Sequence, residues 1–157
     1  MSTKKLEYNV VKKEAQHFIG LPVRITDPER AIDWISALWD RFYRELVFLD
    51  IPNRKTDDIY GIYTDYAGDY TKPYTLIAAC EVNSVEKVPE GLIAHTSPAQ
   101  SYAHFEVIGA FPDNLIDKWG EVWKSDLKRT YKSDFEYFGP EFKTEPPQVD
   151  LFIGIET

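Results

Sequence analysis

The sequence predicts an α+β domain in which one strand–helix–strand–strand unit occurs twice. The segment Ala15-Gln16-x-Phe18 is answered 84 positions later by Ala99-Gln100-x-Tyr102. The same offset matches four further pairs of identical residues: Val23 and Val107, Pro28 and Pro112, Ile32 and Ile116, and Trp39 and Trp123. A repeat of this length is too long for a solenoid unit, so it indicates one domain built from two similar halves.

Composition narrows the class of protein. The chain has 157 residues, 43% hydrophobic and 28% charged, which is enough to bury one core. Its net charge of −8 argues against non-specific nucleic-acid binding, which needs clustered Lys and Arg. Cys80 is alone, and no apolar run approaches the ~20 residues of a membrane span. With no signal-peptide pattern, we expect a single soluble, cytoplasmic domain over residues 1–157, without membrane or direct DNA binding.

The first half, residues 7–83, begins with extended segments at 7–11 and 15–25, where Gly20 is expected to form a bulge or bend. Asp27 and Pro28 then predict the start of a helix, because an acidic N-cap and a proline in the first turn favour that position. Apolar residues recur at near-helical spacing as far as Leu46. Residues 59–63 and 74–82 indicate two strands joined by a polar loop.

The second half, residues 91–156, repeats this order. Residues 91–95 and 101–107 are expected to be extended, and Pro112 precedes a second amphipathic helix. Residues 135–138 and 149–156 indicate the closing strands, separated by a Pro-rich loop. Helices that alternate with hairpins favour an antiparallel sheet with both helices on one face and a ligand groove on the other.

Strand parity assigns side chains of the central strands to these two faces. Glu136 and Phe138 point to one face, predicted to be the groove, and Tyr137 points to the other. In the first half, Gly61 and Tyr63 align with Glu136 and Phe138. The repeat therefore sets a small residue against an acidic one, and such asymmetry at the junction of two halves is typical of a binding site.

The last strand and the second helix add further candidates. Asp150 and Phe152 are predicted to face the groove, whereas Tyr60 is predicted to face the helices. Trp119 and Trp123 are one helical turn apart, and Trp119 is the better candidate for a pocket wall. The row expected to lie under the helices is Leu151, Ile153 and Ile155.

An ordered set of segments resembles the GyrI-like small-molecule-binding family. This family comprises the effector-binding domain of some AraC- and MerR-type regulators and also stand-alone proteins. The resemblance covers nearly the whole chain and rests on these segments: Leu38-Trp39, Ile59-Tyr60-Gly61-Ile62-Tyr63, Ala99-Gln100-Ser101-Tyr102-Ala103-His104-Phe105, the helix with Trp123, Asp134-Phe135-Glu136-Tyr137-Phe138, and Val149-Asp150-Leu151-Phe152-Ile153-Gly154-Ile155.

The resemblance implies a duplicated fold that binds hydrophobic, often cationic aromatic molecules between its halves, in multidrug sensing or sequestration. It also implies that a glutamate after an aromatic residue in the penultimate strand, here Glu136, meets the ligand's positive charge. The sequence departs from this resemblance in two ways: we expect no helix-turn-helix in the 157 residues, and Gly154 replaces the usual proline of the last strand. The ligand-binding candidates are Glu136, Tyr63, Phe138, Phe152, Trp119, Tyr60 and Asp150.

The predicted aromatic surroundings of Glu136 favour a role in binding a cation. A carboxylate among aromatic residues is costly to desolvate, so its pKa should rise. A delocalised cation, held also by aromatic faces, would offset that cost. The alternative is an ordinary solvent-exposed glutamate on a wet face of the sheet.

Two other functions stay open at this point. Some stand-alone members of the family hydrolyse cyclopropane-containing genotoxins, and here Glu136 would be the base with Tyr137 or Tyr63 as its helper. Family members linked to gyrase inhibition suggest a protein-interaction module, although no local feature of this sequence selects it. The three histidines are scattered, so we expect no metal and no cofactor.

Overall fold

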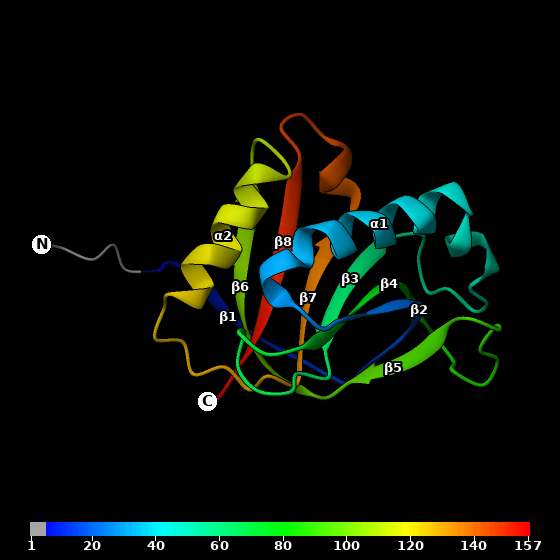
Figure 1. Cartoon of the computed structure of the whole chain (residues 1–157), viewed down its shortest axis with the longest axis horizontal. Coiled ribbons are helices and arrows are strands. Elements are labelled where there is room, and N and C mark those ends of the chain that lie inside the picture. The colour runs from blue at the N-terminus through cyan, green and yellow to red at the C-terminus, as the bar shows by residue number, and fades with distance from the viewer. Residues whose placement is uncertain (1–5) are drawn as a thin grey trace, which may run out of the picture.

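The computed structural model describes residues 6–157 and contains an eight-stranded antiparallel sheet with two α-helices on one side of it (Figure 1). The helices are α1 (Ala31–Arg44) and α2 (Asp113–Trp123). The sheet order is β1-β6-β8-β7-β3-β4-β2-β5. The strands are β1 (Asn9–Lys13), β2 (Gln16–Ile25), β3 (Ile59–Thr64), β4 (Tyr74–Val82), β5 (Ile93–Ser97), β6 (Gln100–Ile108), β7 (Ser133–Phe138) and β8 (Gln148–Ile155).

The two halves lie side by side in the sheet. The first contributes β2-α1-β3-β4 and the second β6-α2-β7-β8, while β5 and β1 form the outer edges. The halves meet where β3 pairs with β7, from Ile59 opposite Phe138 to Thr64 opposite Ser133. The predicted α+β class, with its duplicated unit and helices on one face, is confirmed.

The sheet buries side chains on both of its faces. On the helix face, Leu38 and Phe42 of α1 and Leu115 of α2 pack with strand residues such as Leu76 and Leu151. The opposite face carries a second cluster: Phe18, Tyr60, Ile62, Ile77, Ala79, Tyr102, Phe135 and Phe152. Because the rings of Phe18 and Phe135 lie 6.2 Å apart although two strands separate β2 from β7, the sheet curls around this face. We call it the concave face.

The two helices begin differently. The side chain of Asp27 accepts a hydrogen bond from the Glu29 backbone N–H, in a 3₁₀ turn (Pro28–Arg30) that leads into α1. The predicted cap is therefore confirmed. By contrast, α2 has no side-chain bond at its N-cap, and Gly120 lies in its interior, which lowers its intrinsic stability. None of the helices within residues 6–157 is both long and apolar enough to cross a membrane.

The predicted bulge at Gly20 is wrong. Gly20 pairs in unbroken register with Ala79 of β4 and Ile93 of β5. An added Cβ would lie 2.2 Å from the Ala78 carbonyl oxygen and 2.7 Å from Ala79 Cα. Glycine is needed here because the backbone of β4 approaches closely, which the local sequence does not reveal.

Replacing Gly20 with alanine is expected to lower the free energy of unfolding by about 1–3 kcal/mol, because the colliding atoms belong to backbone that must shift. The matched control is Gly120→Ala, whose added Cβ meets nothing within 4 Å. That change should raise stability by about 1 kcal/mol. Urea denaturation of both variants tests these two predictions. If Gly20→Ala were as stable as the wild type, the prediction of a backbone clash at Gly20 would be contradicted.

Candidate functional site

Glu136 lies at the junction of the two halves, on the helix face of β7. It is directly opposite Gly61 on β3 and Leu151 on β8, and it is only 4% exposed. An added Cβ at Gly61 would come within 2.9 Å of Glu136 Oε1 and 3.1 Å of the Trp39 ring. The predicted alignment of Gly61 with Glu136 is therefore confirmed, and the glycine leaves room for the carboxylate beside α1.

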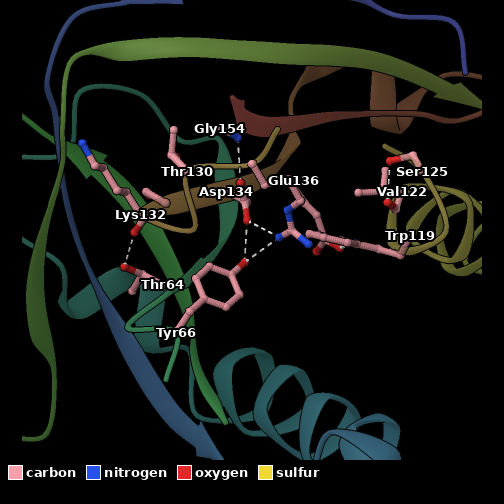
Figure 2. Close-up of polar contacts among 12 residues, drawn as sticks. Thr64, Tyr66, Trp119, Val122, Ser125, Thr130, Lys132, Asp134, Glu136 and Gly154 are labelled. Atoms are coloured by element: carbon pink, nitrogen blue, oxygen red, sulfur yellow. Dashed lines mark hydrogen bonds and ion pairs between the residues drawn. The ribbon is translucent and has the colours of Figure 1, made fainter. Parts of the chain in front are cut away.

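Two aromatic donors hold one oxygen of this carboxylate. Trp119 Nε1 donates to Glu136 Oε2 at 2.8 Å, and the Tyr63 hydroxyl donates to the same oxygen at 3.1 Å. The two donor rings lie 4.8 Å apart. Figure 2 shows Trp119 reaching from α2 toward Glu136. The acid is thus enclosed by β3 on one side and by α2 above it.

The electrostatic state of Glu136 follows from this enclosure. Burial raises the pKa of its carboxyl group from 4.5 to about 7, although the hydrogen bonds from Trp119 and Tyr63 oppose the rise. No Lys, Arg or His within residues 6–157 forms a salt bridge with it. The group therefore titrates near neutral pH, where its ionised form is buried without a salt bridge from residues 6–157.

Aromatic side chains surround this acid on the helix face. Trp39 of α1 packs edge-on against Phe138, with ring centroids 5.6 Å apart. Trp123 does not belong to this group: it is 43% exposed and stacks on Tyr70. Of the predicted residues, the structure brings Tyr63, Trp119 and Phe138 to the same face as Glu136.

The remaining candidates lie on the concave face, so the predicted division between faces is wrong. Phe152 is opposite Phe135, and Asp150 is opposite Tyr137. Directly opposite residues of an antiparallel pair share a face, so Leu151, not Phe152, lies on the face of Glu136. The predicted placement of Leu151 beneath the helices is confirmed. Because Glu136 is opposite Leu151, Glu136 also lies beneath the helices and not on the opposite face, where the groove was predicted.

Tyr60 and Tyr137 also face the concave side, contrary to the prediction that they face the helices. The Tyr137 hydroxyl donates to Asp58 at 2.6 Å, and that of Tyr60 to Glu81 at 3.3 Å. Tyr137 follows Glu136 in β7 and points to the opposite face of the sheet, so it cannot assist Glu136. The Tyr63 hydroxyl, in contrast, is hydrogen-bonded to Glu136.

These concave residues line an open pocket of about 780 Å³, which we call the concave pocket. Tyr60, Tyr137, Phe152 and Asp150 all border it, so half of the predicted set is brought together here and half at Glu136. His104 also borders it, stacked on Phe152 with ring centroids 4.5 Å apart and bonded to Asp150 at 2.9 Å.

A buried ion pair next to Glu136 was missed by sequence reasoning. Arg129 Nη2 donates to Asp134 Oδ2 at 2.7 Å, and the Tyr66 hydroxyl and the Gly154 backbone N–H also donate to Asp134. Figure 2 shows Asp134 between Gly154 and Tyr66. The Arg129 guanidinium lies 6.0 Å from the Trp119 ring. Parity places Asp134 on the face of Glu136, but nothing in the sequence indicates that a loop arginine meets it.

The site offers acid, aromatic and hydroxyl groups but no set of metal ligands. Within residues 6–157, no three His, Cys, Asp or Glu side chains lie close enough together to hold a metal ion. Cys80 is buried in β4, and burial raises its pKa to about 11, which disfavours a nucleophilic thiolate. The chemistry available is therefore that of Glu136 and its two donors.

Solved structures share this fold. SAV2435 bound to tetraphenylphosphonium superposes with a TM-score of 0.80 over 96% of this chain and 94% of that one, at 18% identity. The integron cassette protein VCH_CASS2, from the mobile metagenome of Vibrio cholerae, is 28% identical, with a TM-score of 0.72 over 94% of this chain and 95% of its own.

Sequence comparison identifies the family. Transcriptional regulator BrlR of Pseudomonas aeruginosa is 27% identical over 162 residues, which span 97% of this chain and 56% of that protein. The chain thus spans about half the length of this relative. The family profile Cass2, integron-associated effector binding protein, matches residues 9–155. Together with the GyrI-like fold, this match shows that the chain belongs to the Cass2 family of integron-associated effector-binding proteins.

Proposed function

We propose that this protein binds lipophilic aromatic cations at Glu136, for multidrug sensing or sequestration. The observation that carries the proposal is a buried carboxylate, enclosed by aromatic rings, with no basic partner among residues 6–157. Burying an unpaired carboxylate costs free energy that a cationic ligand would recover. Tetraphenylphosphonium, to which SAV2435 is bound in its solved structure, is a molecule of this class and supports the proposal.

Ligand entry to Glu136 requires a movement of Trp119, which belongs to α2 in the second half of the domain. Trp119 is only 8% exposed and covers Glu136, so a ligand must displace its indole to reach the carboxylate. We expect α2 to be the element that moves, because it has 11 residues against 14 in α1 and contains an interior glycine. We infer that α2 moves outward and that Trp119 then packs on the bound aromatic cation.

The test is a titration with tetraphenylphosphonium and with the neutral triphenylphosphine oxide, at pH 8. Glu136→Gln keeps the shape of the side chain but removes its charge. It should weaken binding of the cation by about tenfold or more and leave the neutral compound within about twofold. Isothermal calorimetry gives both affinities.

The result that contradicts the proposal is an equal loss for both compounds, since the charge would then have no role. Trp39→Phe and Trp119→Phe supply a second readout. If the indole of Trp119 packs on the ligand, ligand-induced quenching of tryptophan fluorescence should shrink in Trp119→Phe more than in Trp39→Phe.

A hydrolase is the second candidate, because one observation favours it. A carboxyl group with a pKa of about 7 is matched to general-base work at neutral pH. Tyr63, not Tyr137, would orient the attacking water, since only Tyr63 bonds to Glu136. Mass spectrometry of a cyclopropane-containing electrophile incubated with the protein tests this: a gain of the mass of water with the wild type, but not with Glu136→Gln, would establish a hydrolase.

A further inference from the structure

We propose that the concave pocket is a second binding site, beyond the function proposed at Glu136, for planar aromatic cations that carry N–H donors. Its volume of about 780 Å³ lies within the range of small-molecule sites. It opens on the opposite side of β7 from Glu136, because Phe135 and Tyr137 line it while Glu136 points away. The two sites therefore share a strand but no side chain.

Hydrogen-bond acceptors outnumber donors at one end of this pocket. Glu81 is 9% exposed, and its two side-chain hydrogen bonds, from Gln16 Nε2 and the Tyr60 hydroxyl, are both long at 3.3 Å. A carboxylate accepts about four such bonds, so acceptor capacity remains. Gln16 also lines the pocket, and its buried Oε1 has no hydrogen-bond partner among residues 6–157. An amine or amidinium that donates to both residues would satisfy them.

Two lysines already occupy positions that suit a cation. Lys13 Nζ lies 4.7 Å from the centre of the Phe152 ring, and Lys55 Nζ lies 3.6 Å from Glu81 Oε2. The side chain of Lys55 is 57% exposed, so it can move into water at small cost. Both contacts show that the pocket stabilises positive charge next to an aromatic ring and next to a buried acid.

The remaining lining selects a flat ligand. Tyr60 and Tyr137 lie with ring centroids 5.0 Å apart, and Phe135 and Phe152 continue the aromatic floor. The lining carries four carboxylates, Glu14, Glu81, Glu141 and Asp150, against the two lysines. A planar cation is therefore favoured over a neutral or anionic molecule of the same size.

The chemistry separates this site from Glu136. The two hydrogen bonds that Glu136 receives, at 3.1 and 2.8 Å, are shorter than the two 3.3 Å bonds to Glu81, so N–H donors on a ligand matter more at Glu81 than at Glu136. Glu81 and Gln16 need donors as well as charge. A phosphonium ion without N–H groups should therefore prefer Glu136, and an amino-substituted heterocycle should prefer the concave pocket.

The test uses the full chain and proflavine, a planar diaminoacridine cation, followed by its fluorescence. Glu81→Gln should weaken proflavine binding by about tenfold or more. Lys55→Gln removes the competing ammonium and should strengthen it by about two- to fivefold. Acridine orange, in which methyl groups replace the amine hydrogens, should bind less tightly than proflavine. Tetraphenylphosphonium should not displace the dye.

Opposite effects of Glu81→Gln and Lys55→Gln cannot arise from a fold defect, and thermal unfolding of both variants checks this directly. Proflavine affinity unchanged by Glu81→Gln, or displacement of the dye by tetraphenylphosphonium, would overturn the proposal. Proflavine binding without tetraphenylphosphonium binding would instead refute the proposed function at Glu136 and leave the concave pocket standing.

Discussion

Replacing Asp134 with alanine is expected to lower the free energy of unfolding by about 3–5 kcal/mol. Asp134 is fully buried and accepts hydrogen bonds from Arg129, Tyr66 and the Gly154 backbone N–H. Without it, the Arg129 guanidinium stays buried with its charge unbalanced, and its Nε and Nη1 atoms have no hydrogen-bond partner in the described part of the chain even in the wild type. Urea denaturation monitored by circular dichroism measures the loss.

The exposed pair formed by Asp40 and Arg44 is the matched control. Their side chains are each 68% exposed, so Asp40→Ala should change stability by less than about 1 kcal/mol. A double variant, Arg129→Met with Asp134→Leu, removes both charges and should recover most of the loss. If Asp134→Ala costs no more than Asp40→Ala, the buried pair does not stabilise the loop between α2 and β7.

The difference in free energy of unfolding between Glu136→Gln and the wild type is expected to be more favourable to the variant at pH 8 than at pH 4. The pKa of Glu136 is raised by burial from 4.5 to about 7, so the folded state favours the protonated carboxyl. Below pH 4.5 both states are protonated and folding carries no penalty. As the pH rises from 4.5 through 7, the wild type loses about 3 kcal/mol, at roughly 1.4 kcal/mol for each pKa unit.

The glutamine variant lacks this titration, so its stability relative to the wild type should grow by that amount between pH 4 and pH 8. Urea denaturation across this interval measures the difference. Glu106→Gln, at an exposed position of β6, controls for the general effect of removing one negative charge. A constant difference between Glu136→Gln and the wild type across the interval would mean that the carboxyl does not titrate there.

The order of elements was predictable because the signals that define it are local. Residues 74–82 form β4 as expected, and Asp27 with Pro28 marks the approach to α1. The repeat also predicted that Gly61 and Glu136 belong together. These features depend on spacing and on the intrinsic preferences of single residues.

The faces of the strands were harder to assign, because parity within one strand does not fix its phase relative to another. Phe152 and Glu136 were placed on one face, and only the cross-strand register, with Glu136 opposite Leu151, separates them. Amphipathic pattern gives little help here because both faces of the sheet are buried. The Arg129–Asp134 pair depends on the path of a loop, which no periodicity describes.

The pairing of Gly61 with Glu136 has a consequence for the origin of the site. The two residues occupy corresponding positions in the two halves, and they also face each other across the β3–β7 ladder. They therefore stand on the axis that would relate two identical halves. Two glutamates there would repel each other, and two glycines would hold no charge. Two identical halves could form the fold but could not set a single acid beside a glycine, so the site depends on this difference between the halves.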